Sequence, residues 1–449
     1  QLSRDESHSH NAINRVAWHI RPERGQGRVS MIAPSSVETL WEASMRCVPG
    51  GIVASYLPPA PARLIIERGL GSRVFDVDGS EYLDWIMGSA SIVLGHAYPT
   101  VVEAVRDQVA RGTQFYATTE ASARLVAELV EAIPCAEQVK LVGDGAEATF
   151  YALRLARAAT QRDKVLMFAG SYHGHHDYAQ VGATAGIPAA INELVLTCPY
   201  NDLASAVDVM ERHAGELAAV IVEPFHRVLA PNPGFLEGLR DAATRLGIVL
   251  IFDEVVTGFR LAYGGAQERY GVTPDLACYG KSLGGGLPIG AIAGPRHIME
   301  LTIAGSDNPS PAFVAGTLNG NPLSCVAALA TLQVLRETDA YAYLAKLGEH
   351  LRKGLREVAK MSPVPLHITG DAGITGVIVA DGNPADPRIL AAVDRVCAAK
   401  LESGLFERGH LVRVPYKWLV STAHTVDEVD RLIEDVSQVC ANPSLRCEL

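Results

Sequence analysis

The sequence predicts an α/β fold, with a large domain built on a mostly parallel β-sheet and a smaller α+β region formed from both chain ends. Three observations support this fold class. The 449 residues are 48% hydrophobic and only 20% charged, as in a compact globular protein with a large core. Between about residues 96 and 330, short apolar runs alternate with amphipathic helical stretches. Beyond about residue 330 the chain is helix-rich and charged.

Five apolar runs are the candidate strands of the large sheet. None alternates with polar residues, which is typical of parallel strands covered on both faces. A helical stretch through Arg157 follows the first run. The runs are Val139–Val142, Lys164–Phe168, Leu217–Val222, Gly247–Phe252 and Leu276–Tyr279.

The two ends of the chain are expected to form the smaller region. Gly376–Val379 and Leu411–Val414 predict a small sheet there, and Ser72–Gly79 predicts pairing in a similar small region. The expected divisions are an N-terminal extension (1–37), the N-terminal part of the small domain (38–95), the large domain (96–329) and the C-terminal part of the small domain (330–449).

Residues able to do chemistry follow these predicted strands. Asp144, Tyr172, Glu223, Asp253 and Lys281 each come after one of the apolar runs. Ligands of parallel sheets collect at the carboxyl ends of the strands, so we expect these side chains to share one site.

Lys281 stands between a predicted buried strand and the glycines Gly284–Gly286. Low dielectric disfavours an ammonium, which makes a neutral amine available as a nucleophile toward an aldehyde. The obvious aldehyde is that of pyridoxal 5'-phosphate (PLP). Asp253, at the end of its strand, could pair with the pyridine nitrogen of PLP and keep it protonated. A helix-capping role is the alternative for Asp253 taken alone, but together with Lys281 the cofactor role is favoured.

Specific motifs surround these two residues. At this point the chain resembles the class III aminotransferases of PLP fold type I, and most closely their branch similar to glutamate-1-semialdehyde aminomutase. The resemblance runs from about Arg73 to Ala327 and continues more weakly to the C-terminus. Its motifs are Phe75–Gly79 followed by Tyr82–Asp84, Leu94–His96, Ser171–Gly174, Glu223–Pro224, Asp253–Arg260, Tyr263–Gln267, Gly280–Lys281 with its glycines, Gly316–Thr317 and Gly320–Leu323.

The resemblance implies a role for each residue. Lys281 binds the cofactor aldehyde covalently and moves a proton between the substrate carbon and the cofactor, while Asp253 holds the pyridinium. Tyr172 and Val255 lie on opposite faces of the ring, although core packing would also suit Tyr172. Glu223 lies beside the cofactor, or is a structural residue that ends its strand.

The resemblance also implies a homodimer with shared active sites, because Gly316 and Thr317 reach the phosphate of the neighbouring subunit. The histidines His173, His175 and His176 with Asp177 are interpreted as turn or surface residues, and no metal is predicted.

The phosphate-binding turn departs from the family. The usual Ser-Gly-Thr is here Asp144-Gly145-Ala146, so both hydroxyls are missing and a carboxylate is present. Asp144 and Glu147 have the spacing of an N-cap, and the cap competes with the phosphate for the same N–H groups. We therefore expect weaker cofactor retention than in relatives.

The substrate end departs as well. After Pro49-Gly50-Gly51 the aminomutases place an arginine that binds a carboxylate, but Ile52–Pro59 contains none. Ser89, Tyr56, Arg413 and Lys417 are the candidate substrate residues. We predict that the substrate lacks an α-carboxylate at its reacting end and is an apolar or polyol-like primary amine, or an aldehyde or ketone.

Transamination between an amine and a carbonyl compound is therefore the favoured function. A 2,1-aminomutase is the second, with Gly305–Pro311 at the place of the family's mobile lid. A non-catalytic PLP-binding protein is the third. Decarboxylation or epimerisation on the same scaffold also stays open.

The bulk composition bears on partners and location. The net charge of −11 disfavours binding to nucleic acid, and no apolar run approaches the length of a membrane span. The eight cysteines form no CxxC pair, and the polar first 30 residues lack a secretory signal. These features predict a cytoplasmic protein with reduced cysteines that acts on small molecules.

Overall fold

The computed structural model describes residues 36–180, 182, 184–305, 308–384 and 386–442. The predicted N-terminal extension lies outside this part of the chain except for its last two residues, and so do residues 306 and 307 of the predicted lid. Among the described residues, no helix combines the length and the hydrophobicity needed to cross a lipid bilayer.

The helices are α1 Val37–Cys47, α2 Met87–Ala90, α3 Pro99–Val109, α4 Glu120–Ala132, α5 Gly145–Thr160, α6 Ala189–Asn192, α7 Leu203–Arg212, α8 Phe235–Leu246, α9 Gly265–Tyr270, α10 Arg296–Met299, α11 Pro322–Glu337, α12 Ala340–Met361, α13 Arg395–Phe406 and α14 Val426–Ala441. The strands are β1 Ile66–Leu70, β2 Arg73–Asp76, β3 Glu81–Asp84, β4 Gln138–Val142, β5 Lys164–Phe168, β6 Val195–Cys198, β7 Leu217–Val222, β8 Val249–Asp253, β9 Leu276–Tyr279, β10 Gly290–Gly294, β11 Leu366–Asp371, β12 Ile374–Val379, β13 His410–Leu411 and β14 Tyr416–Leu419.

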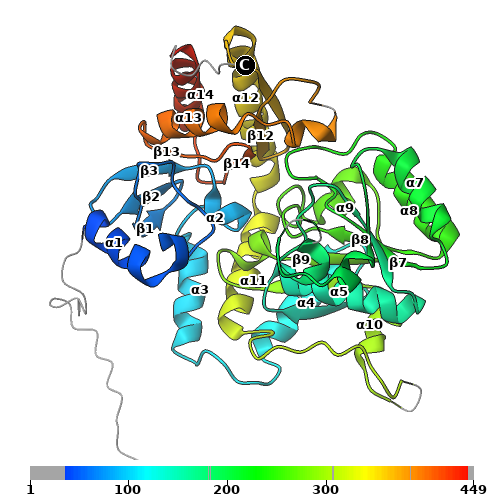
Figure 1. The fold of residues 1–449 in the computed structure, drawn as a ribbon. Helices are drawn as coiled ribbons and strands as arrows, with labels where there is room; N and C mark the ends of the chain where they lie inside the picture. Colours follow the sequence, from blue (N-terminus) through cyan, green and yellow to red (C-terminus); the bar gives the residue numbers. More distant parts are fainter. Residues whose placement is uncertain (1–35, 181, 183, 306–307, 385, 443–449) are drawn as a thin grey trace, which may run out of the picture.

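A seven-stranded sheet in the order β4-β10-β9-β8-β7-β5-β6 forms the centre of the large domain (Figure 1). Strands β6, β5, β7, β8 and β9 run parallel, whereas β10 is antiparallel to both of its neighbours. The α/β fold class and the mostly parallel sheet are therefore confirmed, and each of the five predicted apolar runs is a strand. Strands β6 and β10 were not predicted.

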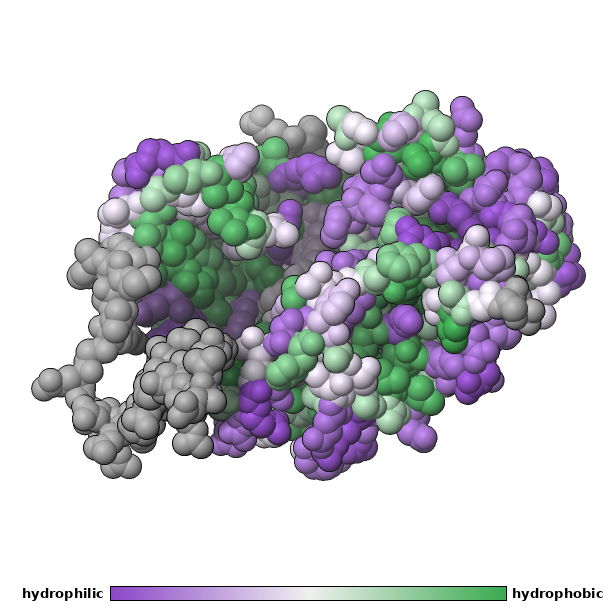
Figure 2. Space-filling view, turned by 90° about the horizontal axis from the view of Figure 1, so that it is seen from below, coloured by the Kyte–Doolittle hydropathy of each residue, from purple (hydrophilic) through white to green (hydrophobic). Residues whose placement is uncertain are grey.

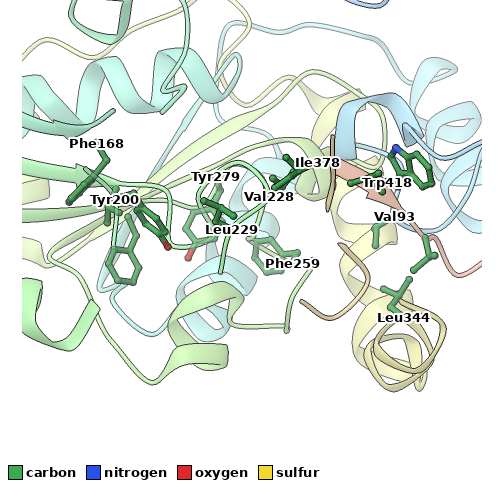
Figure 3. Packing of buried hydrophobic residues seen from close by; sticks show 14 of the residues in the cluster. Val93, Phe168, Tyr200, Val228, Leu229, Phe259, Tyr279, Leu344, Ile378 and Trp418 are labelled. Atoms are coloured by element: carbon green, nitrogen blue, oxygen red, sulfur yellow. The ribbon is translucent and has the colours of Figure 1, made fainter. Parts of the chain in front are cut away.

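Both faces of this sheet are buried, as the unalternating apolar runs predict. Along β8, Val249 and Ile251 join the core beneath α5, whereas Leu250 and Phe252 join a larger core on the other face. Helix α8 ends at Gly247, whose φ of 61° is a conformation that glycine adopts without steric strain. Figure 3 shows the larger core, in which Phe168 and Tyr200 lie near each other.

Segments from both chain ends meet in the smaller sheets. One sheet has the order β1-β2-β3-β13, and the parallel pairing of β13 with β3 brings the C-terminal part beside the N-terminal part (Figure 1). The other has the order β11-β12-β14.

The predicted pairing within the C-terminal part is wrong in one respect. His410–Leu411 joins the N-terminal sheet, and β12 pairs with Tyr416–Leu419 instead. The sequence does not show which of two apolar runs of similar length pairs with β12, because tertiary packing selects the neighbouring strand. The domain limits stay a prediction.

The surface and the cysteines complete the description. On the face seen from below, hydrophobic residues gather in a hollow and hydrophilic residues dominate the rim (Figure 2). Cys135, Cys198, Cys278 and Cys325 are buried free thiols. Cys397, however, is disulfide-bonded, so the expectation of reduced cysteines throughout is wrong at this position. Spacing along the chain does not show which thiols the fold brings together.

Candidate active site

A cavity of about 650 Å³ opens at the carboxyl ends of β7, β8 and β9. Its lining includes Asp144, Tyr172, Glu223, Asp253 and Lys281, the five residues that follow the predicted strands. The rule that ligands collect at this edge of a parallel sheet therefore placed these side chains correctly in one site. The cavity is large enough for a cofactor together with a small substrate.

Strand register explains how Asp253 and Lys281 come to share the cavity. Asp253 is the last residue of β8 and is directly opposite Cys278 of the parallel strand β9. Lys281 follows Cys278 by three residues and begins a short 3₁₀ turn, Lys281–Gly284. Its φ of 48° is uncommon for a residue with a side chain, and such backbone conformations cluster at functional sites.

His173 holds the Asp253 carboxylate in place. Nδ1 of His173 lies 2.7 Å from Oδ2 of Asp253, and the backbone N–H of Val255 donates to Oδ1 at 3.1 Å. Both side chains are buried. Nε2 of His173 is also buried and has no hydrogen-bond partner among the described residues. This pairing was missed in the sequence, where the Ser171–Gly174 motif was the only available signal.

Glu223, after the end of β7, belongs to a second buried charge cluster. Its Oε2 accepts from the backbone N–H of Arg227 at 3.0 Å and lies 3.3 Å from Nδ1 of His226. Burial opposes ionisation, but the neighbouring charges of His226, Arg227 and Lys417 outweigh it and hold the pKa of Glu223 well below its usual range. Glu223 is thus a buried anion that faces two cations lining the same cavity.

Lys417, on β14, is only 4% exposed and lines the cavity. Burial lowers the pKa of Lys417 to about 7, an effect that Glu223 partly offsets and that the positive charges of Arg227 and Lys281 reinforce. The fold therefore supplies a second amine near Lys281 that titrates close to neutral pH.

We expect Lys417→Met to stabilise the cofactor-free protein at pH 6 by on the order of 2–4 kcal/mol. In the unfolded chain the pKa of Lys417 has its ordinary value of 10.5, so between about pH 7 and pH 10.5 the folded protein has already lost this proton while the unfolded chain still keeps it. The stability of the parent protein then rises across this window, and the cost of a charged Lys417 is complete below pH 7.

Thermal unfolding from pH 6 to pH 10, in buffer without polyvalent anions, measures this effect. The advantage of Lys417→Met should shrink as the pH rises. The matched control is Lys353→Met, since Lys353 is exposed on α12. A difference that is the same at every pH would contradict the prediction.

At the other end of the cavity, Asp144 is the N-cap of α5, as its spacing predicts. Its Oδ1 accepts from the backbone N–H of Glu147 at 2.8 Å, and Oε2 of Glu147 accepts from the N–H of Gly143 at 2.8 Å. The backbone N–H groups of Gly145 and Ala146 have no acceptor among the described residues, and both residues line the cavity. Two free amide donors at a helix N-terminus suit an anion, but Asp144 adds a negative charge beside them.

Close packing holds this helix end against the rest of the cavity. A Cβ atom on Gly145 would lie 2.7 Å from both methyl groups of Val255, so only glycine allows α5 to approach the turn after β8 this closely. Tyr172 is 49% exposed and lines the cavity, which contradicts simple core packing for this residue. Its ring centroid lies 6.0 Å from Cζ of Arg227.

The predicted substrate residues divide into two groups. Ser89 and Lys417 line the cavity, and Oγ of Ser89 lies 2.8 Å from the hydroxyl of Tyr416, which the sequence did not single out. Tyr56 and Arg413 do not line it. The hydroxyl of Tyr56 donates to the carbonyl of Val412 at 3.5 Å, and Arg413 lines a neighbouring cavity.

Gly316 and Thr317 are not brought into the cavity by this chain. Both are exposed, and the carbonyl of Thr317 accepts from the side-chain amide of Gln114. The sequence analysis also did not predict that Arg227 lines the cavity. Nothing in the sequence around an arginine that follows a Glu-Pro pair shows that it lies near a ligand. No group of three or more metal-ligating side chains is found within the described residues.

Comparison with known proteins identifies the family. Residues 58–436 match the family model Aminotransferase class-III. The chain is 38% identical over 424 residues to the glutamate-1-semialdehyde 2,1-aminomutase of Syntrophus aciditrophicus, a match that covers 90% of this chain and 96% of the relative. The aminomutase 2 of Brevibacillus brevis is 39% identical over 415 residues, covering 88% and 96%.

Solved structures include both transaminases and an aminomutase. An ω-transaminase from Sphaerobacter thermophilus superposes with a TM-score of 0.84 at 33% identity, covering 92% of this chain and 99% of the other. A glutamate-1-semialdehyde aminomutase from Pseudomonas aeruginosa gives 0.82 at 25% identity, covering 90% and 93%. The resemblance noted in the sequence is thereby confirmed, and the chain belongs to the class III aminotransferases.

Proposed function

We propose that the protein is a PLP-dependent transaminase that moves an amino group between an amine without a carboxylate on its reacting carbon and a carbonyl acceptor. The observation that carries the proposal is the strand register that brings the Asp253 carboxylate and the Lys281 amine into one cavity. When bound, PLP supplies an aldehyde that condenses with amines and a ring that withdraws electrons from the substrate carbon.

The residues present fit this cofactor at both of its ends. The buried carboxylate of Asp253 would hold a proton on the ring nitrogen. Its contacts with His173 and with the N–H of Val255 prevent it from rotating freely. The free N–H groups of Gly145 and Ala146 would hold the phosphate. Tyr172 and Val255 would flank the ring, and their apolar surfaces exclude water from the faces where charge develops.

Lys281 has two tasks in the proposed reaction. Its amine would hold the cofactor until a substrate amine displaces it. The freed amine would then take a proton from the substrate carbon and return it during amino transfer. The wall of the cavity formed by residues 52–59 contributes Ser55 and no cation, which supports a substrate whose reacting carbon lacks a carboxylate.

An aminomutase is the second candidate. The names of the curated relatives favour it, and Arg227 with Lys417 could hold the carboxylate of such a substrate in place of the missing arginine. The two functions differ in whether the product leaves before it reacts again.

The test of transamination is an absorption spectrum of the PLP-loaded protein. A primary amine without an α-carboxylate should remove the visible absorption band, and a carbonyl acceptor should restore it. Glutamate 1-semialdehyde converted without any separate acceptor would establish the aminomutase instead. A loaded protein whose spectrum responds to neither compound would contradict both functions.

We expect Asp144→Ser to tighten PLP binding by about three- to tenfold. Serine keeps the N-cap of α5 and removes the charge that repels the phosphate, which is worth roughly 1 kcal/mol between partly solvated like charges. Titration of the apoprotein with PLP, followed by absorbance, measures the affinity. Asp107→Ser, an exposed acidic residue on α3, is the control, and an unchanged or weaker affinity would contradict the prediction.

We also propose a homodimer in which Gly316 and Thr317 complete the partner's cofactor site. Thr317 is exposed in the single chain. Large hydrophobic side chains are also exposed, both next to Thr317 in the sequence and in the segment around residue 115. They include Phe115, Tyr116, Phe313 and Leu318, which are 52%, 86%, 70% and 58% exposed. Hydrophobic side chains exposed to this degree favour burial at an interface between subunits.

A further inference from the structure

A second cavity of about 560 Å³ lies beside the first and is lined by four arginines and one lysine and by no carboxylate. We call it the arginine cavity and define it by Arg227, Arg388, Arg395, Arg413 and Lys417. Two of these, Arg227 and Lys417, also line the first cavity, together with Tyr416. The two cavities therefore share a wall of three side chains, two of them cations.

These positive charges are poorly compensated by the protein itself. Arg227, Arg395 and Lys417 have no ion pair or side-chain hydrogen bond with any described residue. The side chain of Arg413 makes one weak hydrogen bond, from Nη1 to the carbonyl of Ser55 at 3.4 Å, and its Cζ lies 5.9 Å from the ring centroid of Tyr416. Only Arg388 has a carboxylate partner, Asp386, at 2.5–2.9 Å.

The nearest other carboxylates do not neutralise the cavity. Glu402 interacts electrostatically with Arg413, but burial raises the pKa of Glu402 to about 7, so at neutral pH it is only partly ionised. Glu223 interacts electrostatically with Arg227 and Lys417 from the side of the first cavity and so offsets only part of the positive charge.

Local backbone structure supports the same conclusion. Arg227 has a φ of 55°, a left-handed conformation that is uncommon for an arginine, and such conformations cluster at functional sites. In a protein with a net charge of −11, four arginines gathered around one cavity, three of them exposed to solvent, form a local positive surface that would attract an anion.

We infer that the arginine cavity is a subsite for a doubly charged anionic group on the far end of the substrate. A phosphate monoester and a pair of neighbouring carboxylates both carry two negative charges, and guanidinium groups bind either one through two parallel hydrogen bonds. A single carboxylate would leave most of the positive charge uncompensated. The reacting amine or carbonyl would lie near Lys281, and the chain of the substrate would pass the wall of Arg227, Tyr416 and Lys417. This inference rests on the proposed aminotransfer and adds to it the chemical class of the substrate.

The binding test uses the PLP-loaded protein, so that the cofactor itself occupies its own phosphate site. Isothermal titration with inorganic pyrophosphate and with citrate separates a phosphate from a carboxylate source. We expect at least one of them to bind, and the double variant Arg395→Ala/Arg413→Ala to weaken that binding at least tenfold. Arg395 and Arg413 line only the arginine cavity, so the variant leaves the lining of the first cavity intact.

The control variant is Arg212→Ala, which removes an exposed arginine of α7 far from both linings and should change the affinity by less than twofold. No binding of either anion to the parent protein would overturn the inference, and so would equal binding by the parent and the double variant.

A kinetic arm separates this inference from the proposed function. Amines that share a –CH₂NH₂ end and differ at the far end are compared, with phosphate, dicarboxylate or methyl groups there. The double variant should lose at least tenfold in kcat/KM for the anionic amines and less than twofold for the methyl compound. Turnover of all amines without an anionic preference overturns the subsite and leaves aminotransfer intact. Anion binding that the double variant loses, without turnover of any amine, leaves the subsite intact and overturns aminotransfer.

Discussion

Replacement of Lys281 by alanine should lower the rate of amino transfer by at least about 10³-fold. Lys281 enters the cavity from the turn after β9. The pairing of β9 with β8 places this turn beside Asp253. A methyl group there can neither hold the cofactor covalently nor move a proton at the substrate carbon. The visible absorption that the lysine–cofactor bond produces should also disappear.

Stopped-flow absorbance of the PLP-loaded variant with an amine donor measures both effects. The control is Lys353→Ala, on the exposed face of α12, which should keep the parent rate and spectrum. Lys417 is a second amine in the same cavity, so the variant also tests whether Lys417 can take over the role of Lys281. A variant that keeps the visible band and more than a tenth of the parent rate would show that Lys281 is not the reacting amine.

Asp253→Asn should lower the same rate by about 10²- to 10³-fold. The amide is nearly isosteric, so it should stay in the buried position between His173 and the N–H of Val255. It cannot, however, carry the negative charge that keeps a proton on the ring nitrogen, and the ring then withdraws electrons less strongly. Because Nδ1 of His173 loses a charged partner, we also expect a small loss of thermal stability.

The half-reaction rate and the unfolding temperature are measured side by side to distinguish chemistry from folding. Asp241→Asn, an exposed carboxylate of α8, provides the control. A rate within threefold of the parent would contradict the assigned role of Asp253. A variant that unfolds below room temperature would be replaced by Asp253→Glu, which keeps the charge but displaces it and should also lose more than tenfold in rate.

Much of the fold could be predicted because its signals are local. The strands β5, β7, β8 and β9 are nearly continuous apolar runs, because burial on both faces leaves few polar positions between their ends. Strand β10, with the sequence Gly-Ala-Ile-Ala-Gly, was missed because its small residues have weak strand propensity. It is a strand because it is paired on both sides, a fact that depends on its neighbours.

The sequence by itself determined that Asp253 and Lys281 share a cavity and that Asp144 caps α5. Asp253 and Lys281 lie at the ends of two strands, and the geometry of parallel strands places such ends together whatever the loops do. The spacing between Asp144 and Glu147, three positions later, was enough to predict that Asp144 caps α5.

Only the tertiary structure decided the surroundings of this pair. His173 meets Asp253 across 80 positions of the chain, and the arginine cavity combines Arg227 with cations from residues 388–417. Burial, pairing and charge at these positions depend on how separate loops and the C-terminal sheet pack against the large domain. No local pattern encodes that packing, since an arginine that lines a cavity and an arginine elsewhere on the surface are preceded and followed by the same kinds of residue.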